Sequence, residues 1–111
     1  RRGFLVKDQI DFNGASGAAY RFRLAENGDP KTTISGNFLF VREETDGVSV
    51  LYVGATDNLA AGVRVRWDEA VREHGATHIY TRLNIAGRAR AEEMEDLVAA
   101  LSPVMNTQPA H

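Results

Sequence analysis

The sequence has 111 residues, which is long enough for one compact domain with its own core and too short for two. Hydrophobic residues make up 43% of it and charged residues 25%, an ordinary composition for a globular protein. No apolar run reaches the roughly 20 residues that a membrane-spanning helix needs, so we expect no membrane partner. The 13 Lys and Arg residues against 15 Asp and Glu give a net charge of -2, which argues against a protein whose whole surface binds nucleic acid.

The sequence contains no cysteine, which excludes disulfide bonds and any metal site built from thiolates. No cationic segment followed by an apolar run marks a secretory signal, so a cytoplasmic location is expected. The first residue is Arg1 rather than methionine, and whether a preceding segment supplies targeting or part of the function stays open.

Two N-terminal segments, residues 4–12 and 18–24, alternate apolar with polar side chains and are predicted to be strands. Residues 13–17 between them contain two glycines but not the lysine of a phosphate-binding loop, so we interpret them as a turn. The turn-forming residues 26–30 separate this pair from the rest of the chain. The two strands can form a sheet edge that is available for pairing with a partner.

Residues 36–41 and 48–53 are more continuously apolar, which is typical of strands covered on both faces of a sheet. The acidic segment 43–46 lies between them, and the Asp46-Gly47 pair favours a turn. The sequence therefore predicts a hairpin in which both strands are buried.

Two helices are predicted to pack on this hairpin. The first begins at a cap, Asp57 or Asn58, and ends at Gly75, whereas the second spans residues 87–101 and ends before Pro103. The predicted core-facing side chains are Leu59, Val63, Trp67, Ala70, Val71 and His74 in the first helix, and Met94, Leu97, Val98 and Leu101 in the second.

A further strand, residues 78–83, is predicted between the two helices. The order of elements is then strand, strand, helix, strand, helix, preceded by the N-terminal strand pair. This order predicts an α/β fold class, with a small mixed, largely antiparallel sheet flanked by helices.

Four short motifs occur in a fixed order through residues 36–106. They are Gly36-Asn37-Phe38, Tyr52-Val53-Gly54, Asn58-Leu59, and Leu97-Val98 followed by Pro103-Val104-Met105-Asn106. This order resembles the GIY-YIG nuclease superfamily, in which a hairpin presents two tyrosines to a cleft, the next helix supplies an arginine and a later helix supplies a metal-binding glutamate. The resemblance implies a GIY-YIG-like domain over residues 34–108, with residues 1–33 as a strand extension packed on the same domain.

Three of the catalytic positions implied by this resemblance carry different chemistry in this sequence. Phe38 stands for the first tyrosine and lacks its hydroxyl, and Gly62 stands for the arginine that neutralises the scissile phosphate. Met94 stands for the glutamate, and its thioether is a poor ligand for Mg²⁺, which requires hard oxygen donors. Tyr52 matches the second tyrosine, but one tyrosine cannot neutralise the charge that develops during phosphodiester cleavage. The resemblance therefore implies a catalytically inactive domain with no metal and no other cofactor.

The alternative is an active Mg²⁺-dependent DNA endonuclease that uses displaced groups. Glu93 and Glu95 flank Met94, but neighbours on a helix are about 100° apart, so both carboxylates are expected to point away from the sheet. Arg66 lies four residues after Gly62 on the same helix face and is the better substitute for the missing cation. If this alternative holds, Mg²⁺ is the implied cofactor.

Two functions without catalysis stay open. In the first, the module binds DNA or another nucleic acid through a local patch. The predicted contacts of this patch are Arg64, Arg66, Arg88, Arg90 and Asn106. Acidic residues alternate with these arginines, so a salt-bridged surface without a ligand explains the same pattern.

In the second function, the module binds a protein partner, which its net negative charge and the apolar residue Met94 permit. Neither function needs a metal. His74 and His78 have no partner histidine at a ligand spacing on a helix, and we interpret them as surface or packing residues.

Overall fold

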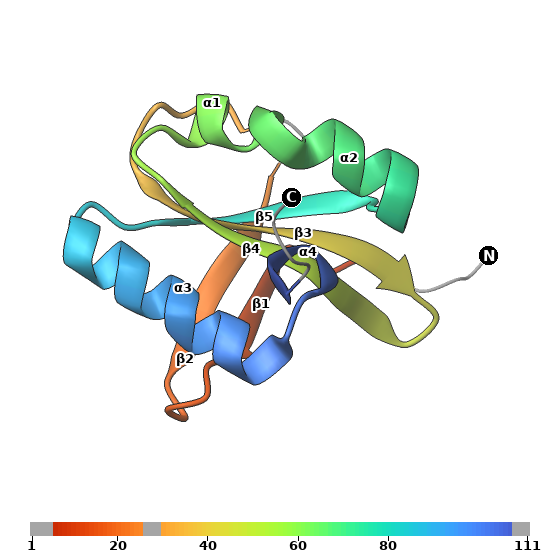
Figure 1. Ribbon diagram of the computed structural model, residues 1–111, viewed down its shortest axis with the longest axis horizontal. Helices are drawn as coiled ribbons and strands as arrows, with labels where there is room; N and C mark the ends of the chain where they lie inside the picture. Colours follow the sequence, from red (N-terminus) through yellow and green to blue (C-terminus); the bar gives the residue numbers. More distant parts are fainter. Residues whose placement is uncertain (1–5, 26–29, 108–111) are drawn as a thin grey trace.

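The structure is a computed structural model that describes residues 6–25 and 30–107. These residues form one five-stranded sheet with helices on both of its faces (Figure 1). The strands are β1 (Gln9–Asn13), β2 (Ala19–Leu24), β3 (Gly36–Glu44), β4 (Gly47–Thr56) and β5 (His78–Leu83). The helices are α1 (Leu59–Gly62), α2 (Arg64–His74), α3 (Gly87–Leu101) and α4 (Val104–Thr107). The α/β fold class predicted from the sequence, a sheet flanked by helices, is confirmed.

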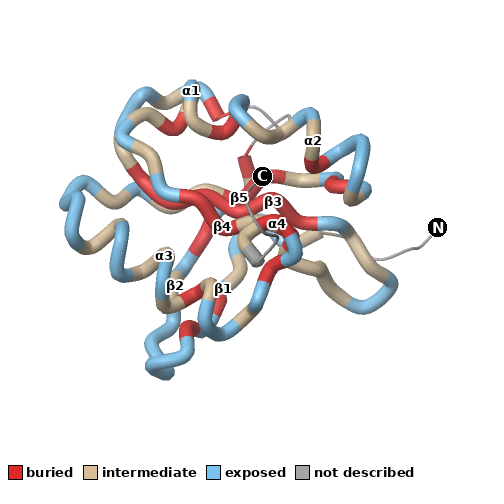
Figure 2. Tube along the Cα trace, viewed as in Figure 1, coloured by how far each residue is buried: buried red, intermediate tan, exposed pale blue. Residues whose placement is uncertain are grey.

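β3 is the central strand of the domain. The strands are ordered β1-β2-β5-β3-β4, and each described pairing between neighbours is antiparallel. Residues 36–41 of β3 are all buried, as their continuous apolar character predicted. Figure 2 shows this burial along the middle of the sheet. β3 is therefore covered on both faces and paired along both edges.

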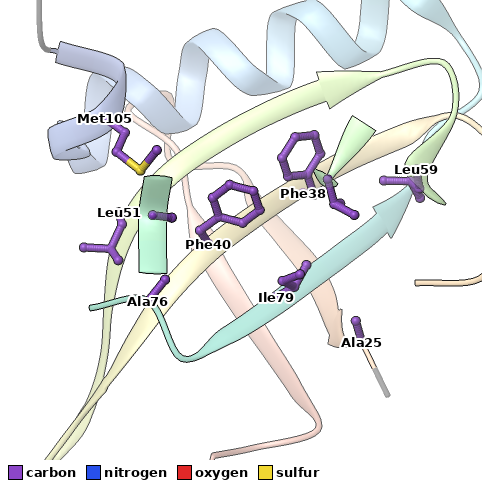
Figure 3. Close-up of a cluster of buried hydrophobic side chains, with 10 residues drawn as sticks. Ala25, Phe38, Phe40, Leu51, Leu59, Ala76, Ile79 and Met105 are labelled. Carbon is purple, nitrogen blue, oxygen red and sulfur yellow. The ribbon is translucent and has the colours of Figure 1, made fainter. Parts of the chain in front are cut away.

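Alternate side chains of β3 enter two separate hydrophobic cores. Phe38 and Phe40 point to the face that α1 and α2 cover, whereas Leu39 and Val41 point to the face that α3 covers. The first core also contains Leu51, Leu59, Val63, Ala70, Ile79 and Met105, most of which are labelled in Figure 3. The second core also contains Phe12, Phe22, Val53, Tyr80 and Leu97. The predicted apolar side of α3, which includes Met94 and Leu101, packs against this second core.

The first predicted helix is interrupted at Val63, which separates α1 from α2. The interruption follows Gly62, and a glycine inside a helix costs about 1 kcal/mol relative to alanine. Both predicted ends are present. The Ala61 N–H donates to Asn58 Oδ1 at 3.0 Å, and Gly75 ends α2 in the left-handed conformation with φ of 73°. One helix in the sequence pattern is therefore two helices in the structure.

Val71 is 42% exposed, although the sequence pattern placed it in the core. The preceding residue, Ala70, is fully buried against the sheet. Adjacent residues on a helix differ by about 100° in direction, so Val71 turns away from the sheet when Ala70 faces it. In α2 the small residue Ala70, and not the larger Val71, therefore faces the sheet.

Several element boundaries differ from the prediction. β1 begins at Gln9, later than the predicted start, and residues 1–5 lie outside the described part of the chain. β3 and β4 are longer than predicted because they stay paired to the turn, where Glu44 pairs with Gly47. The short helix α4 follows Pro103, where the sequence predicted only an end. The longest described helix, α3, has 15 residues, and no helix of residues 6–25 and 30–107 is long and apolar enough to cross a lipid bilayer.

Asp96 of α3 holds the turn between β1 and β2 against the helix through hydrogen bonds. Its carboxylate accepts hydrogen bonds from the Ser16 N–H at 2.8 Å, the Ser16 hydroxyl at 2.6 Å and the Tyr20 hydroxyl at 2.7 Å. A side chain on Gly14 would overlap this carboxylate, so another residue there would have to displace Asp96 from the turn. β2 also pairs with β5, and the two N-terminal strands therefore belong to the same sheet as the hairpin.

Asp96 also makes the stability of this contact depend on pH. The hydrogen bonds from Ser16 and Tyr20 lower the pKa of Asp96 from its ordinary value of 3.8. A carboxylate with a lowered folded-state pKa stabilises the fold above its unfolded pKa and loses this contribution as the pH falls through the folded pKa. We therefore expect Asp96→Asn to be less stable than the wild type near neutral pH, and the two proteins to converge below pH 3.8.

Urea unfolding of both proteins over a series of pH values checks this expectation. Asp68→Asn is the matched control, because it removes one exposed carboxylate from α2 without touching the turn. A stability difference for Asp96→Asn that stays the same over the acidic range would contradict the assigned role of the carboxylate.

Candidate functional site

Phe38 and Tyr52, the two aromatic positions of the resembled motif, lie side by side on the face of the sheet that α2 covers. Their ring centroids are 5.8 Å apart, and the Phe40 ring lies 5.4 Å from each of them. Trp67 of α2 contacts Phe40 edge-on at 5.1 Å. We call Phe38, Phe40, Tyr52 and Trp67 the aromatic cluster. The hairpin thus brings the two motif positions together, but within a packed hydrophobic cluster.

Gly54 makes room for the Phe38 ring. The two residues are paired across β3 and β4, and a Cβ on Gly54 would lie only 2.6 Å from Phe38 Cε1. Phe38 is 4% exposed. A hydroxyl at this position would need a hydrogen-bond partner inside the core, because an unpaired buried hydroxyl is costly. A ring without a polar group therefore suits the surroundings of Phe38.

Arg66 of α2 covers the Tyr52 ring, with its guanidinium carbon 4.9 Å from the ring centroid. Its Nε and Nη2 donate to the two oxygens of Glu69 at 2.9 and 2.8 Å, and its Nη1 donates to the Met105 carbonyl at 3.2 Å. The hydrogen bonds to Glu69 raise the pKa of Arg66 above its ordinary value. The guanidinium beside Tyr52 is therefore already paired within the molecule.

Gly62, at the position of the family arginine, packs against the Thr56 side chain. A Cβ on Gly62 would lie 2.6 Å from Thr56 Cβ and closer still to its hydroxyl. The Thr56 hydroxyl is fixed, because it accepts from the Asn58 N–H at 3.2 Å and donates to the Asn58 carbonyl at 3.1 Å. An arginine at this position would require the chain around Thr56 to move.

Met94 lies on the opposite side of the sheet from Tyr52. Met94 packs against the second core, and Tyr52 packs against the first. Met94 also lines an open groove of about 460 Å³ between the end of β4 and α3, together with Asp57 and Glu95. Tyr52 is not part of this lining. The structure thus does not bring the glutamate position and the tyrosine position together.

Glu93 was expected to point away from the sheet, and this expectation is wrong. Its carboxylate pairs with Arg82 of β5 at 2.9 Å, and its side chain is only 18% exposed. Arg82 is long enough to reach α3 from the sheet, and its guanidinium also lies 5.5 Å from the Tyr20 ring centroid. Glu95 is exposed, as expected. Both carboxylates belong to α3, across the sheet from Tyr52.

Asn106 completes the outer edge of β4. Its Oδ1 accepts from the Val53 N–H at 2.8 Å, and its Nδ2 donates to the Val53 carbonyl at 2.9 Å. The side-chain amide thus imitates one residue of a neighbouring strand and satisfies groups that an edge strand leaves unpaired. Asn106 was predicted to contact nucleic acid, and both polar atoms of its side chain bond its own chain.

The four predicted arginine contacts lie on two different helices. Arg64 and Arg66 belong to α2, and Arg88 and Arg90 belong to α3, which covers the other face of the sheet (Figure 1). Arg90 Nη1 donates to two carbonyls of the loop before α3 at 3.0 and 2.7 Å. Arg64 and Arg88 are exposed. The structure therefore does not gather the four arginines on one face.

Asn37 is a buried polar residue that the sequence pattern did not single out. It is fully buried, and its Nδ2 donates to the Arg90 carbonyl at 3.1 Å and the Gly54 carbonyl at 3.4 Å. Its Oδ1 accepts from Asn84 Nδ2 at 3.0 Å. Asn37 thereby joins β3, β4 and the start of α3. The available signal was an asparagine in the middle of an otherwise apolar strand, where the resembled motif has isoleucine.

Comparison of the chain with protein-family models, with curated proteins and with solved structures finds no match in any of the three. The GIY-YIG resemblance therefore rests on the motifs in the sequence. The α/β fold rests on the structure and does not depend on this resemblance.

The packing of Gly62 can be tested by adding one methyl group. We expect Gly62→Ala to lower the free energy of unfolding by about 1–3 kcal/mol, because the overlap with Thr56 outweighs the gain in helix propensity. Gly87→Ala at the start of α3 is the control. The nearest atom to its new Cβ lies 3.5 Å away, so it should be neutral or stabilising. Equal urea stabilities of the two variants would contradict the overlap.

The role of Asn106 as a strand mimic gives a second prediction. We expect Asn106→Ala to lower the free energy of unfolding by about 1–2 kcal/mol, because both hydrogen bonds to Val53 are lost. Asn106→Asp keeps the acceptor but removes the donor, so it should also be destabilised. Asn13→Ala, at the exposed end of β1, should change stability by less than about 0.5 kcal/mol.

Hydrogen exchange at the Val53 amide distinguishes this role from a general loss of packing. In Asn106→Ala this amide should exchange faster, whereas amides in β1 should exchange as in the wild type. Unchanged protection of Val53 in Asn106→Ala would show that the side chain does not hold the edge of β4.

Proposed function

We propose that this chain is a catalytically silent, GIY-YIG-like α/β module that acts by binding a protein partner. The observation that carries the proposal is the use of the predicted site's polar groups for contacts within the molecule. Arg66, Arg90 and Asn106 each bond main-chain groups of their own chain. The proposed setting is the cytoplasm, as the cysteine-free sequence favours.

The surroundings of Tyr52 support a silent module over an endonuclease. Phosphodiester cleavage needs a cation and a hard metal ligand beside the reacting group. The guanidinium beside Tyr52 belongs to Arg66 and is paired in two places with Glu69. Met94, at the position of the metal-binding glutamate, lies across the sheet. Displaced residues would therefore have to act from both sides of the sheet at once.

The charge distribution supports a protein partner over a nucleic acid. Binding to a phosphate backbone depends on several cations that face the ligand together. Here the arginines are divided between α2 and α3, and three further arginines form ion pairs. These pairs are Arg21–Asp11, Arg42–Glu44 and Arg82–Glu93. Together with the net charge of -2, this distribution argues against a surface that binds a phosphate backbone.

Exposed aliphatic side chains at one end of the sheet offer a surface for a protein partner. Ile34, Leu83 and Ile85 are 45%, 58% and 79% exposed. The Asn84 N–H donates to the Ser35 carbonyl at 3.0 Å, which places Ile34 beside Ile85 just beyond the end of the β3 and β5 pairing. We call Ile34, Leu83 and Ile85 the end patch. Contiguous exposed apolar side chains commonly mark contacts with other proteins.

The first experiment separates a silent module from a nuclease and from a nucleic-acid binder. Linear, supercoiled and branched DNA incubated with the protein and Mg²⁺ or Mn²⁺ should stay intact, with or without Tyr52→Phe. Cleavage that Tyr52→Phe abolishes would establish the nuclease instead. Labelled DNA should show no salt-dependent binding by fluorescence anisotropy. Steeply salt-dependent binding that Arg88→Gln weakens would favour the nucleic-acid function.

The second experiment tests the end patch with matched serine variants. Affinity capture is compared between the wild type, Leu83→Ser with Ile85→Ser, and Val65→Ser, which removes an 80% exposed side chain from α2 outside the patch. The wild type and Val65→Ser should capture a partner of the end patch in equal amounts at low and high salt. The double variant should capture about tenfold less of it, or even less. Equal retention by all three proteins would exclude the end patch as the contact.

A further inference from the structure

The C-terminal half of α2 carries a cluster of side chains that can bind a metal ion. Glu69, Glu73 and His74 each offer one ligand atom, a carboxylate oxygen or an imidazole nitrogen, and these atoms all lie within 4.8 Å of one another. Glu69 and Glu73 are one helical turn apart, so they share a face of α2. Because only one histidine takes part, histidine spacing alone does not reveal the cluster.

His74 supplies a second observation, independent of the acidic side chains. Its Nε2 atom is buried and has no hydrogen-bond partner among residues 6–25 and 30–107. A buried polar atom without a partner is costly, and such atoms in native proteins call for an explanation such as a bound ion. The unpartnered nitrogen belongs to the same imidazole that lies beside Glu69 and Glu73.

We propose that Glu69, Glu73 and His74 form a binding site for a first-row transition metal ion, for which Zn²⁺ is the best fit. Zn²⁺ binds imidazole nitrogen and carboxylate oxygen at about 2.0–2.2 Å, commonly with three protein ligands and one water. Mg²⁺ fits less well, because it prefers oxygen ligands in an octahedral arrangement. The site is separate from the Met94 position, where the resembled family binds its metal.

Metal binding requires at most a modest contraction of the cluster. Ligand atoms about 2.1 Å from a tetrahedral ion are about 3.4 Å apart, which is closer than the 4.8 Å limit within which these atoms now lie. Glu73 is exposed and can change its rotamer, whereas Glu69 and His74 are half-buried. The exposed carboxylate of Glu73 can therefore move toward the other two ligands, of which Glu69 is held by Arg66.

Arg66 is a charged group in direct contact with this site, and it bonds both oxygens of Glu69 at 2.9 and 2.8 Å. These hydrogen bonds lower the pKa of Glu69 and keep it ionised. An ionised carboxylate has about four lone-pair positions, so each oxygen can still bind a metal. Arg66 is also held by the Met105 carbonyl at 3.2 Å. It can therefore stay in place and orient Glu69, as outer-shell partners of metal ligands commonly do.

Isothermal titration of the chelator-treated protein with ZnCl₂ tests the proposal. The wild type should bind about one ion per chain, and His74→Ala and Glu73→Gln should each weaken the affinity about tenfold or more. His78→Ala is the matched control, because His78 lies on β5 and contacts the Thr77 hydroxyl at 2.9 Å. His111→Ala is a second control, because it removes the remaining histidine of the sequence. Both controls should bind Zn²⁺ as the wild type does.

Thermal unfolding with and without Zn²⁺ gives a readout that does not depend on calorimetric heats. Zn²⁺ should raise the Tm of the wild type and His78→Ala, but not that of His74→Ala. Without metal, His74→Ala should fold as the wild type does by circular dichroism, because the substitution removes an unpartnered atom. The proposal is overturned if the wild type binds no Zn²⁺, if His74→Ala and Glu73→Gln bind it normally, or if only a control loses binding.

Discussion

The burial of β3 on both faces is the constraint on which the rest of the structure depends. Because successive side chains of a strand point to opposite faces, Phe38 and Phe40 join one core, and the residues between and beside them join the other. A shift by one residue would exchange these two sets and turn Asn37 away from its partners at the start of α3. Pairing with β3 fixes β4 in turn, so Tyr52 must share the face of Phe40. Strand pairing therefore determines which side chains of the resembled motif lie on the same face of the sheet.

The polar side chains around Tyr52 bond groups of their own chain and leave little charge for a ligand there. Arg66 serves three purposes there, since it covers the tyrosine ring, pairs with Glu69 and holds the carbonyl of Met105 before Asn106. Asn106 then closes the edge of β4. The C-terminal motif of the sequence is thus explained by packing and strand pairing. A structural role of this kind accounts for these residues without any contact to a substrate.

The sequence located elements well where periodicity alone decides them, and poorly where a distant contact decides them. The predicted bounds of β5 and α3 match the structure, because each has a clear apolar pattern between turn residues. The break at Val63 follows Gly62, which lies against Thr56, and the apolar periodicity continues through the break without revealing it. The resemblance placed Phe38 and Tyr52 on one hairpin, but the contact between their rings also depends on the register shift between Phe40 and Val41, which the sequence pattern does not reveal. The hydrogen bonds of Asn106 to Val53 could not be predicted, because they join residues that are 53 positions apart in the sequence.

The three positions at which the sequence departs from the resembled motif are Phe38, Gly62 and Met94, and neighbouring residues limit what each position can hold. Phe38 lies over Gly54 in the core, so a tyrosine there must bury its hydroxyl. An arginine in place of Gly62 would have to displace Thr56, whose hydroxyl holds Asn58 at the start of α1. A glutamate in place of Met94 would bring a charge to the edge of the second core, across the sheet from Tyr52. Placing the side chains of the resembled nuclease motif on this fold would therefore create neither a cleft nor its charges, because the contacts around these three positions would also have to change.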